Sequence, residues 1–173
     1  MNPYTFVAQA TDQGESLLSL CAGVGFELTH STGEITAVDI HDKYLTELKN
    51  KYPHVNTVCS DVEDYIVKAK DKSFDVISFI DGLEHLDKDK GLRVLKECKR
   101  VARKQILVFT QIGYLKNEPH NAWGIEGGDE YQKHRSGWEV QELKDLGYEL
   151  IAQADSISQH GEPYTAVMYQ CLV

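Results

Sequence analysis

The sequence has few basic residues, no closely paired cysteines and no long apolar run, and each shortage excludes a class of protein. Its 18 lysines and arginines against 27 acidic residues give a net charge of −9, which disfavours a nucleic-acid partner. The four cysteines form no C-x-x-C pair, so neither a metal site nor a disulfide framework is predicted. No stretch approaches the roughly 20 apolar residues that span a bilayer, and the first residues do not resemble a signal peptide. We therefore expect a cytoplasmic protein in a reducing compartment, without a membrane partner.

The length and composition are those of an ordinary globular protein. With 173 residues, 42% of them hydrophobic, the chain is expected to form a single domain over 1–173. Short apolar runs bounded by turn residues predict strands, and their nearly continuous apolar character is typical of parallel strands buried on both faces. The five predicted strands are 17–21, 35–40, 55–59, 74–80 and 105–112.

Helical periodicity lies between these strands. Leu45 and Leu48 share one face of 43–51, and leucines recur in the same way along 91–102. Alternating strands and helices predict an α/β fold, a doubly wound and mostly parallel sheet with helices on both faces. Between Gly25 and Asp39 there is room for a first helix of about two turns.

The last third of the chain predicts one more helix and two more strands. The S-x-x-E pattern from Ser136 to Glu139 resembles a capping box, with Ser136 as N-cap of a helix from about Trp138 to Leu146. The runs 148–154 and 164–173 predict a C-terminal antiparallel hairpin, which brings the sheet to seven strands.

One long segment has no clear periodicity. Gly113 to Arg135 is an aromatic-rich stretch of about 20 residues, and loops of that length in compact domains are usually functional. We predict a binding lid. Tyr114, Trp123 and Tyr131, together with His120, either shape an acceptor pocket or cover the edge of the core.

Candidate binding residues follow the strands, because ligands of doubly wound sheets lie beyond the carboxyl ends of the strands. Gly23 and Gly25 follow the first strand and let a ligand approach the backbone. Asp39 ends the second strand, where a carboxylate accepts hydrogen bonds from both hydroxyls of a ribose. Together they indicate an adenosine-containing cofactor. NAD is disfavoured because Leu28 stands where the dinucleotide fingerprint has its third glycine.

Four segments at the ends of successive predicted strands resemble, in this order, the motifs of the class I S-adenosylmethionine-dependent methyltransferases. The resemblance extends over nearly the whole chain. The glycine-rich first motif corresponds to 18–25, the ribose-binding second to 38–40, the adenine-side third to 60–62 and the "FD…D-x-x-EHL" fourth to 74–86. The region 100–110, with 134–138 later, further resembles a bacterial-type subset that acts mostly on small molecules or glycan-related substrates.

The resemblance implies a Rossmann-like methyltransferase fold, S-adenosyl-L-methionine as cofactor and methyl transfer to an oxygen or nitrogen of a small-molecule acceptor. Ser19 and Cys21 stand where the family usually has an acidic residue and its first glycine, which predicts a weaker grip on the amino-acid end of the cofactor. The cofactor-binding residues implied are Cys21, Ala22, Gly23, Gly25, Asp39, Ile40, Asp61, Val62 and Asp81. For Asp61, capping of a helix over 62–69 is an equally good interpretation.

Four residues are candidates for catalysis. His134 ends the predicted lid and titrates near neutrality, so it is either the base that receives the acceptor proton or a structural histidine. Asp81, Glu84 and His85 come next; the last two either act on the acceptor or hold the loop after the fourth strand.

Three other functions share parts of this pattern. A binding module that kept the cofactor and lost turnover is consistent with Ser19 and Cys21. An NAD-dependent oxidoreductase would share Asp39, and a nucleic-acid methyltransferase is disfavoured by the charge of −9. Homodimerisation is left open.

Overall fold

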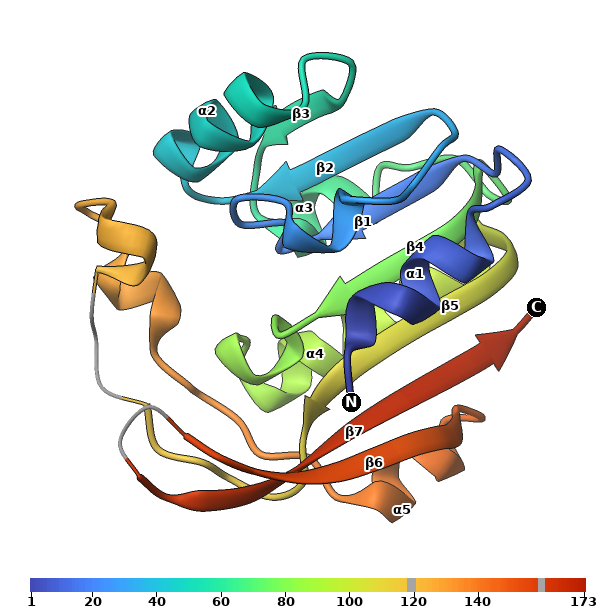
Figure 1. Ribbon diagram of the computed structural model, residues 1–173. Coiled ribbons are helices and arrows are strands. Elements are labelled where there is room, and N and C mark those ends of the chain that lie inside the picture. The colour runs from blue at the N-terminus through green and yellow to red at the C-terminus, as the bar shows by residue number, and fades with distance from the viewer. Residues whose placement is uncertain (118–120, 159–160) are drawn as a thin grey trace.

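The computed structural model describes residues 1–117, 121–158 and 161–173, and a seven-stranded sheet runs through its centre (Figure 1). The strand order is β3-β2-β1-β4-β5-β7-β6. The first five strands pair in parallel, and β7 is antiparallel to both β5 and β6. This confirms the mostly parallel sheet with a C-terminal antiparallel hairpin. The strands are β1 (Leu17–Leu20), β2 (Ile35–Asp39), β3 (Asn56–Cys59), β4 (Phe74–Ile80), β5 (Ala102–Gln111), β6 (Glu149–Ile157) and β7 (Pro163–Leu172).

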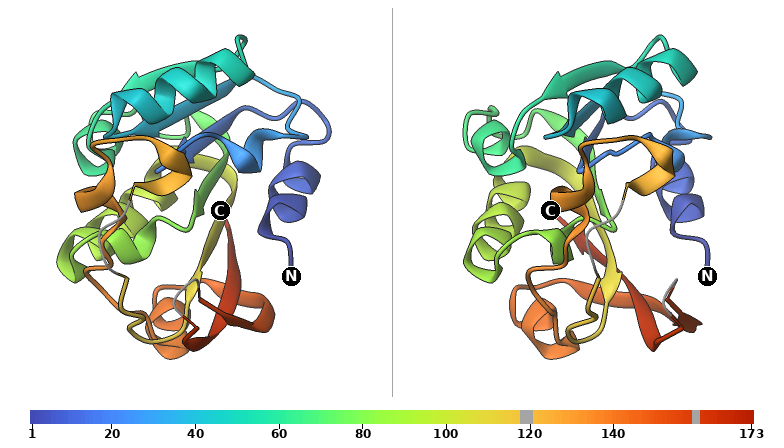
Figure 2. Two further views of the ribbon diagram at one scale, coloured as in Figure 1. Left: turned by 60° about the vertical axis from the view of Figure 1, so that its left-hand side comes forward. Right: turned by 90° about the vertical axis from the view of Figure 1, so that its left-hand side faces the viewer.

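Helices cover both faces of the sheet, as the buried strands require (Figure 2). One core joins the sheet to α1 and α2, and the other joins its opposite face to α3, α4 and α5. None of the helices described is long and apolar enough to cross a membrane. Their bounds are α1 (Pro3–Ala10), α2 (Asp42–Lys51), α3 (Val62–Ile66), α4 (Lys88–Val101) and α5 (Val140–Asp145).

The segment after β1 corrects one prediction. In place of a two-turn helix, a single 3₁₀ turn, η1 (Phe26–Leu28), follows Gly25 before the chain leads to β2. The N-terminal helix α1, which no pattern predicted, packs against this turn and against β4 and β5. Asn2 caps α1 through its side chain, which accepts the N–H of Tyr4 at 3.0 Å. The N-terminal helix therefore covers the face that the short turn leaves open.

The cap of α5 corrects a second prediction. Ser136 is not the N-cap, because its hydroxyl accepts the indole N–H of Trp138 at 2.9 Å and lies 3.4 Å from the carbonyl of Leu83. The N-cap is Glu139, whose N–H donates to the Glu142 carboxylate at 2.7 Å. The helix is accordingly shorter than predicted. Trp138 is 1% exposed and anchors the segment before α5 in the hydrophobic core.

Gly91 in α4 offers a test of this anchor, because a Cβ there would lie 2.6 Å from Cζ2 of Trp138. In an open helix alanine is more favourable than glycine by about 1 kcal/mol. Here we expect Gly91→Ala to lower the free energy of unfolding by about 1–3 kcal/mol through overpacking, measured by urea denaturation. Lys96→Ala, at an exposed position of the same helix, should change it by less than about 0.5 kcal/mol. A Gly91→Ala protein as stable as the parent would contradict this packing.

Candidate functional site

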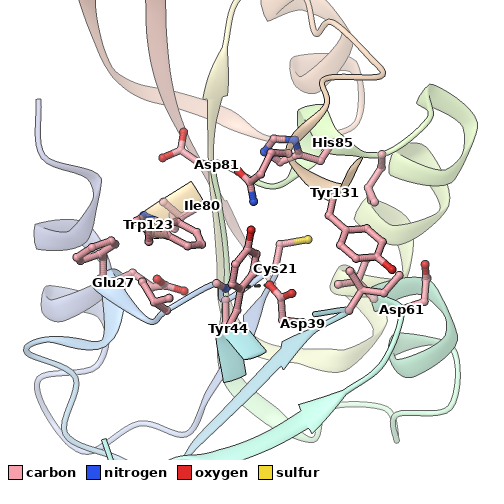
Figure 3. A pocket seen from close by; sticks show the side chains of 18 of the residues that line it. Cys21, Glu27, Asp39, Tyr44, Asp61, Ile80, Asp81, His85, Trp123 and Tyr131 are labelled. Carbon is pink, nitrogen blue, oxygen red and sulfur yellow. Dashed lines mark hydrogen bonds between the residues drawn. The ribbon is translucent and has the colours of Figure 1, made fainter. Parts of the chain in front are cut away.

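A cavity of about 310 Å³ lies at the carboxyl ends of the parallel strands. Asp39 and Tyr44 lie at one end of it and Asp81 and His85 at the other (Figure 3). Gly25 lies outside the lining; a Cβ there would stand 3.0 Å from Cγ of Leu48. The other eight predicted cofactor residues line the cavity: Cys21, Ala22, Gly23, Asp39, Ile40, Asp61, Val62 and Asp81.

The turn after β1 has a left-handed backbone at three positions. Gly23 has φ 52° and Gly25 has φ 78°, which glycine adopts without strain. Cys21 has φ 54°, a conformation that favours glycine, and this is the position where the family usually has one. Burial, and then the charge of Asp39, raise the pKa of the Cys21 thiol well above its usual value. Cys21 is therefore a neutral wall residue.

Asp39 connects this turn to the end of β2. One carboxylate oxygen accepts the N–H of Gly23 and the other accepts the N–H of His41, each at 2.9 Å. The side chain is 7% exposed, and burial raises its pKa despite these two bonds. The carboxylate holds the two loops together and still presents an edge to the cavity.

Asp61 caps α3, as one of the two interpretations predicted, and α3 ends at Ile66, earlier than expected. Its side chain accepts the N–H of Glu63 at 2.9 Å and forms an ion pair with Lys90 of α4. Burial alone would raise the pKa of Asp61, but the hydrogen bond from Lys90 and that from Glu63 lower it below its ordinary value. An ionised, tethered carboxylate thus stands in the cavity wall.

A buried acid that the sequence analysis missed, Glu27, lies on η1 and lines the same cavity. It is 6% exposed and hydrogen-bonds with the hydroxyl of Ser19 in β1. Burial raises its pKa to about 7, against the opposing effect of the Ser19 hydrogen bond. The family usually has an acidic residue at the position of Ser19. Its absence there, together with an acidic residue eight positions later, is the signal in the sequence that could have identified Glu27.

The predicted lid lines the cavity through Trp123 and Tyr131. The indole of Trp123 lies so close to Gly23 that a Cβ there would be 2.7 Å from its Cη2. The same indole meets the Tyr44 ring edge-on, with centroids 4.9 Å apart, and Tyr131 lies 5.9 Å from the ring of His41. Tyr114 is 60% exposed and does not line this cavity, and His120 lies outside the described residues.

The four candidate catalytic residues come together at a second cavity, of about 330 Å³. Asp81, Glu84, His85 and His134 all line it, and Asp81 and His85 also line the first cavity. Glu84 is 1% exposed and accepts the hydroxyl of Thr110 at 2.9 Å. Burial raises the pKa of Glu84, and burial together with the Glu84 charge raises the pKa of Asp81.

His134 reaches this place because the end of the lid is bonded to the turn after β4. The carbonyl of Glu84 accepts the N–H groups of Arg135 at 2.8 Å and Ser136 at 3.1 Å. The rings of His134 and His85 lie with their centroids 4.9 Å apart. Nδ1 of His134 is 2.6 Å from the carbonyl oxygen of Leu115, so a base at His134 would act through Nε2.

Glu27 predicts a pH dependence of stability. Between about pH 4.5 and 7 the unfolded chain releases the Glu27 proton while the folded chain keeps it, so the fold loses stability as pH rises. Glu27→Gln stays neutral throughout, so the comparison with the parent reports the Glu27 proton. In urea denaturation the stability of the parent relative to Glu27→Gln should fall from pH 4.5 to 7 and then level off. A difference that stays constant with pH would remove this assignment.

Comparisons with known proteins identify the family of the chain. A family model of the methyltransferase domain matches residues 18–109. A search of curated protein sequences finds no match. Among solved structures, the YcgJ protein of Bacillus subtilis superimposes with a TM-score of 0.72 at 12% identity, covering 98% of this chain and 97% of that one.

Two further structures share the fold and were solved with cofactor. One is the 1,6-didemethyltoxoflavin-N1-methyltransferase of Burkholderia thailandensis, with bound 1,6-didemethyltoxoflavin and S-adenosylhomocysteine. It superimposes with a TM-score of 0.66 at 13% identity, covering 98% of this chain and 78% of that one. The other is the magnesium protoporphyrin IX methyltransferase of Synechocystis with bound S-adenosylmethionine. Its TM-score is 0.65 at 13% identity, and the match covers 98% of this chain and 77% of that one. Since the family match covers more than half of the chain and includes all four strand-end motifs, this chain belongs to the class I S-adenosylmethionine-dependent methyltransferases.

Proposed function

We propose that this methyltransferase acts on an oxygen or nitrogen atom of a small-molecule acceptor. The observation that carries the proposal is the meeting of two cavities at Asp81 and His85. The first is lined by the residues expected to bind cofactor, and the second, of about 330 Å³, has the volume of a small-molecule site. An acceptor in the second cavity would therefore face the end of the first, where the methyl group is expected.

The charges and surfaces of the first cavity suit this cofactor. Glu27, Asp39 and Asp81 contribute carboxyl groups to its wall, and a ligand carrying an ammonium and a sulfonium would favour their ionised form. Ile40 is 41% exposed at the end of β2, an apolar surface against which a planar base packs. We assign the ribose hydroxyls to Asp39 and the base to Ile40 and Val62, with Asp61 at its edge.

When bound, the cofactor supplies a methyl group activated by the sulfonium. The protein holds the acceptor atom in line with that methyl group and receives the proton that the acceptor atom loses. His134 is the first candidate to receive it, and Asp81, Glu84 and His85 line the same cavity.

The alternative of an NAD-dependent oxidoreductase fits the site poorly. Its pyrophosphate needs a helix N-terminus after the glycine turn, and the turn here leads into only the three residues of η1. A cytoplasmic location stays a prediction, and homodimerisation stays open.

The function can be tested by turnover. Purified protein is incubated with methyl-labelled S-adenosylmethionine and a panel of small hydroxyl and amine compounds, and formation of S-adenosylhomocysteine is measured. We expect transfer to at least one class. Calorimetry on the same sample distinguishes the alternatives: binding of the S-adenosyl compounds without turnover favours the non-catalytic module, and binding of NAD alone contradicts the proposal.

Replacing Asp39 tests the cofactor assignment. Asp39→Ala should weaken binding of S-adenosylhomocysteine by about 1–3 kcal/mol, the usual loss for hydrogen bonds to a charged group, as measured by calorimetry. Asp71→Ala is the matched control, because that carboxylate precedes β4 at the opposite edge of the sheet and is exposed. Equal affinity in the two variants would remove Asp39 from the site.

A further inference from the structure

Three side chains with metal-ligating atoms meet in the wall of the second cavity. One ligand atom each of Glu84, His85 and His134 lies within 4.8 Å of the other two. Glu84 and His134 are buried, 1% and 8% exposed, while His85 is half-buried and reaches both cavities. No metal site is predicted from the sequence, because His134 lies at the far end of the lid and is distant from Glu84 and His85 along the chain.

The backbone fixes this meeting. The carbonyl of Glu84 accepts the N–H groups of Arg135 and Ser136, which places His134 directly beside the turn after β4. The guanidinium of Arg135 in turn donates to the carbonyls of His85 and Lys133, each at 3.2 Å. The two segments are joined on both sides of the histidine pair, so the three ligand groups are held together before any ligand arrives.

The hydrogen bonds of both imidazoles select one tautomer. Nδ1 of His85 lies 3.3 Å from the carbonyl oxygen of Lys133, and Nδ1 of His134 lies 2.6 Å from that of Leu115. A carbonyl oxygen only accepts, so each Nδ1 carries the hydrogen and the lone pair of a neutral ring is on Nε2. Histidines that ligate metals are held in this way, through the nitrogen that does not bind the ion.

Glu84 is oriented in a comparable manner. Its Oε2 accepts the hydroxyl of Thr110 in β5 at 2.9 Å, which fixes the direction of the carboxylate. Ligating carboxylates are themselves hydrogen-bonded as a rule. All three side chains therefore have the outer contacts that a metal site requires.

We propose that Glu84, His85 and His134 bind one divalent first-row transition-metal ion of the Zn²⁺ and Co²⁺ type. Two imidazoles and one carboxylate suit such ions, whereas Mg²⁺ and Ca²⁺ select oxygen ligands. Three protein ligands leave a coordination position for water or substrate, as catalytic sites do. That position opens toward the second cavity, which the same residues line.

This site rests on the proposed function and narrows it to an oxygen acceptor. A hydroxyl bound to the ion loses its proton to solvent water, because the ion lowers the pKa of the hydroxyl. The oxygen then forms a bond to the methyl carbon as the carbon–sulfur bond breaks, and sulfur keeps the electron pair as a neutral thioether. In this assignment His134 is a ligand and not the base.

The experiment titrates Co²⁺ into the full chain and follows its visible absorption. The parent should bind one equivalent, Zn²⁺ should displace it and Mg²⁺ should not. Glu84→Gln keeps the shape and the contact with Thr110 but removes the charge, and His134→Gln removes one ring. Each should weaken binding on the order of 100-fold, since changes outside the ligands alone cost 10–100-fold. His54→Ala, at an exposed histidine, is the control and should bind as the parent does.

The same samples are tested for S-adenosylhomocysteine binding and circular dichroism, which report the cofactor cavity and the fold. Binding of Co²⁺ that is lost in Glu84→Gln and His134→Gln, with cofactor affinity retained, supports the site. Absence of Co²⁺ binding by the parent at millimolar concentration, or equal binding by parent and both variants, overturns it. Failure of cofactor binding or turnover with the metal site intact counts against the proposed function alone.

Discussion

One backbone carbonyl, that of Glu84, decides the shape of the site. By accepting two N–H groups from the end of the lid, it returns a long segment to the carboxyl edge of the sheet. This segment contributes Trp123 and Tyr131 to the wall of the first cavity and His134 to that of the second. Because the bond partners are main-chain groups, the arrangement depends on the path of the backbone and not on the identity of the side chains.

The parallel sheet could be predicted because its information is local. Runs such as Phe74–Ile80 are apolar at five of seven positions, which is typical of a strand covered on both faces. The carboxylate of Asp39 was predictable for the same reason, because its position at the end of a strand fixes where it points.

What could not be predicted depends on competition between partners. The sequence around Ser136 resembles a capping box, but the Ser136 hydroxyl accepts a hydrogen bond from the indole N–H of Trp138. Glu139 is therefore the N-cap of the helix. The partnership of Glu27 with Ser19 requires a turn too short to be a helix, which the spacing alone did not specify. His134 and His85 are far apart in the chain, and only the folded lid makes them neighbours.

The contact of Trp123 with Gly23 and Tyr44 joins the lid to the wall of the first cavity. Tyr131 lies in the wall of the first cavity, and Gln132, its neighbour in the lid, borders both cavities. Trp123 and Gln132 thus place one segment of the chain against both cavities. A ligand that shifts this segment in one cavity changes the wall of the other.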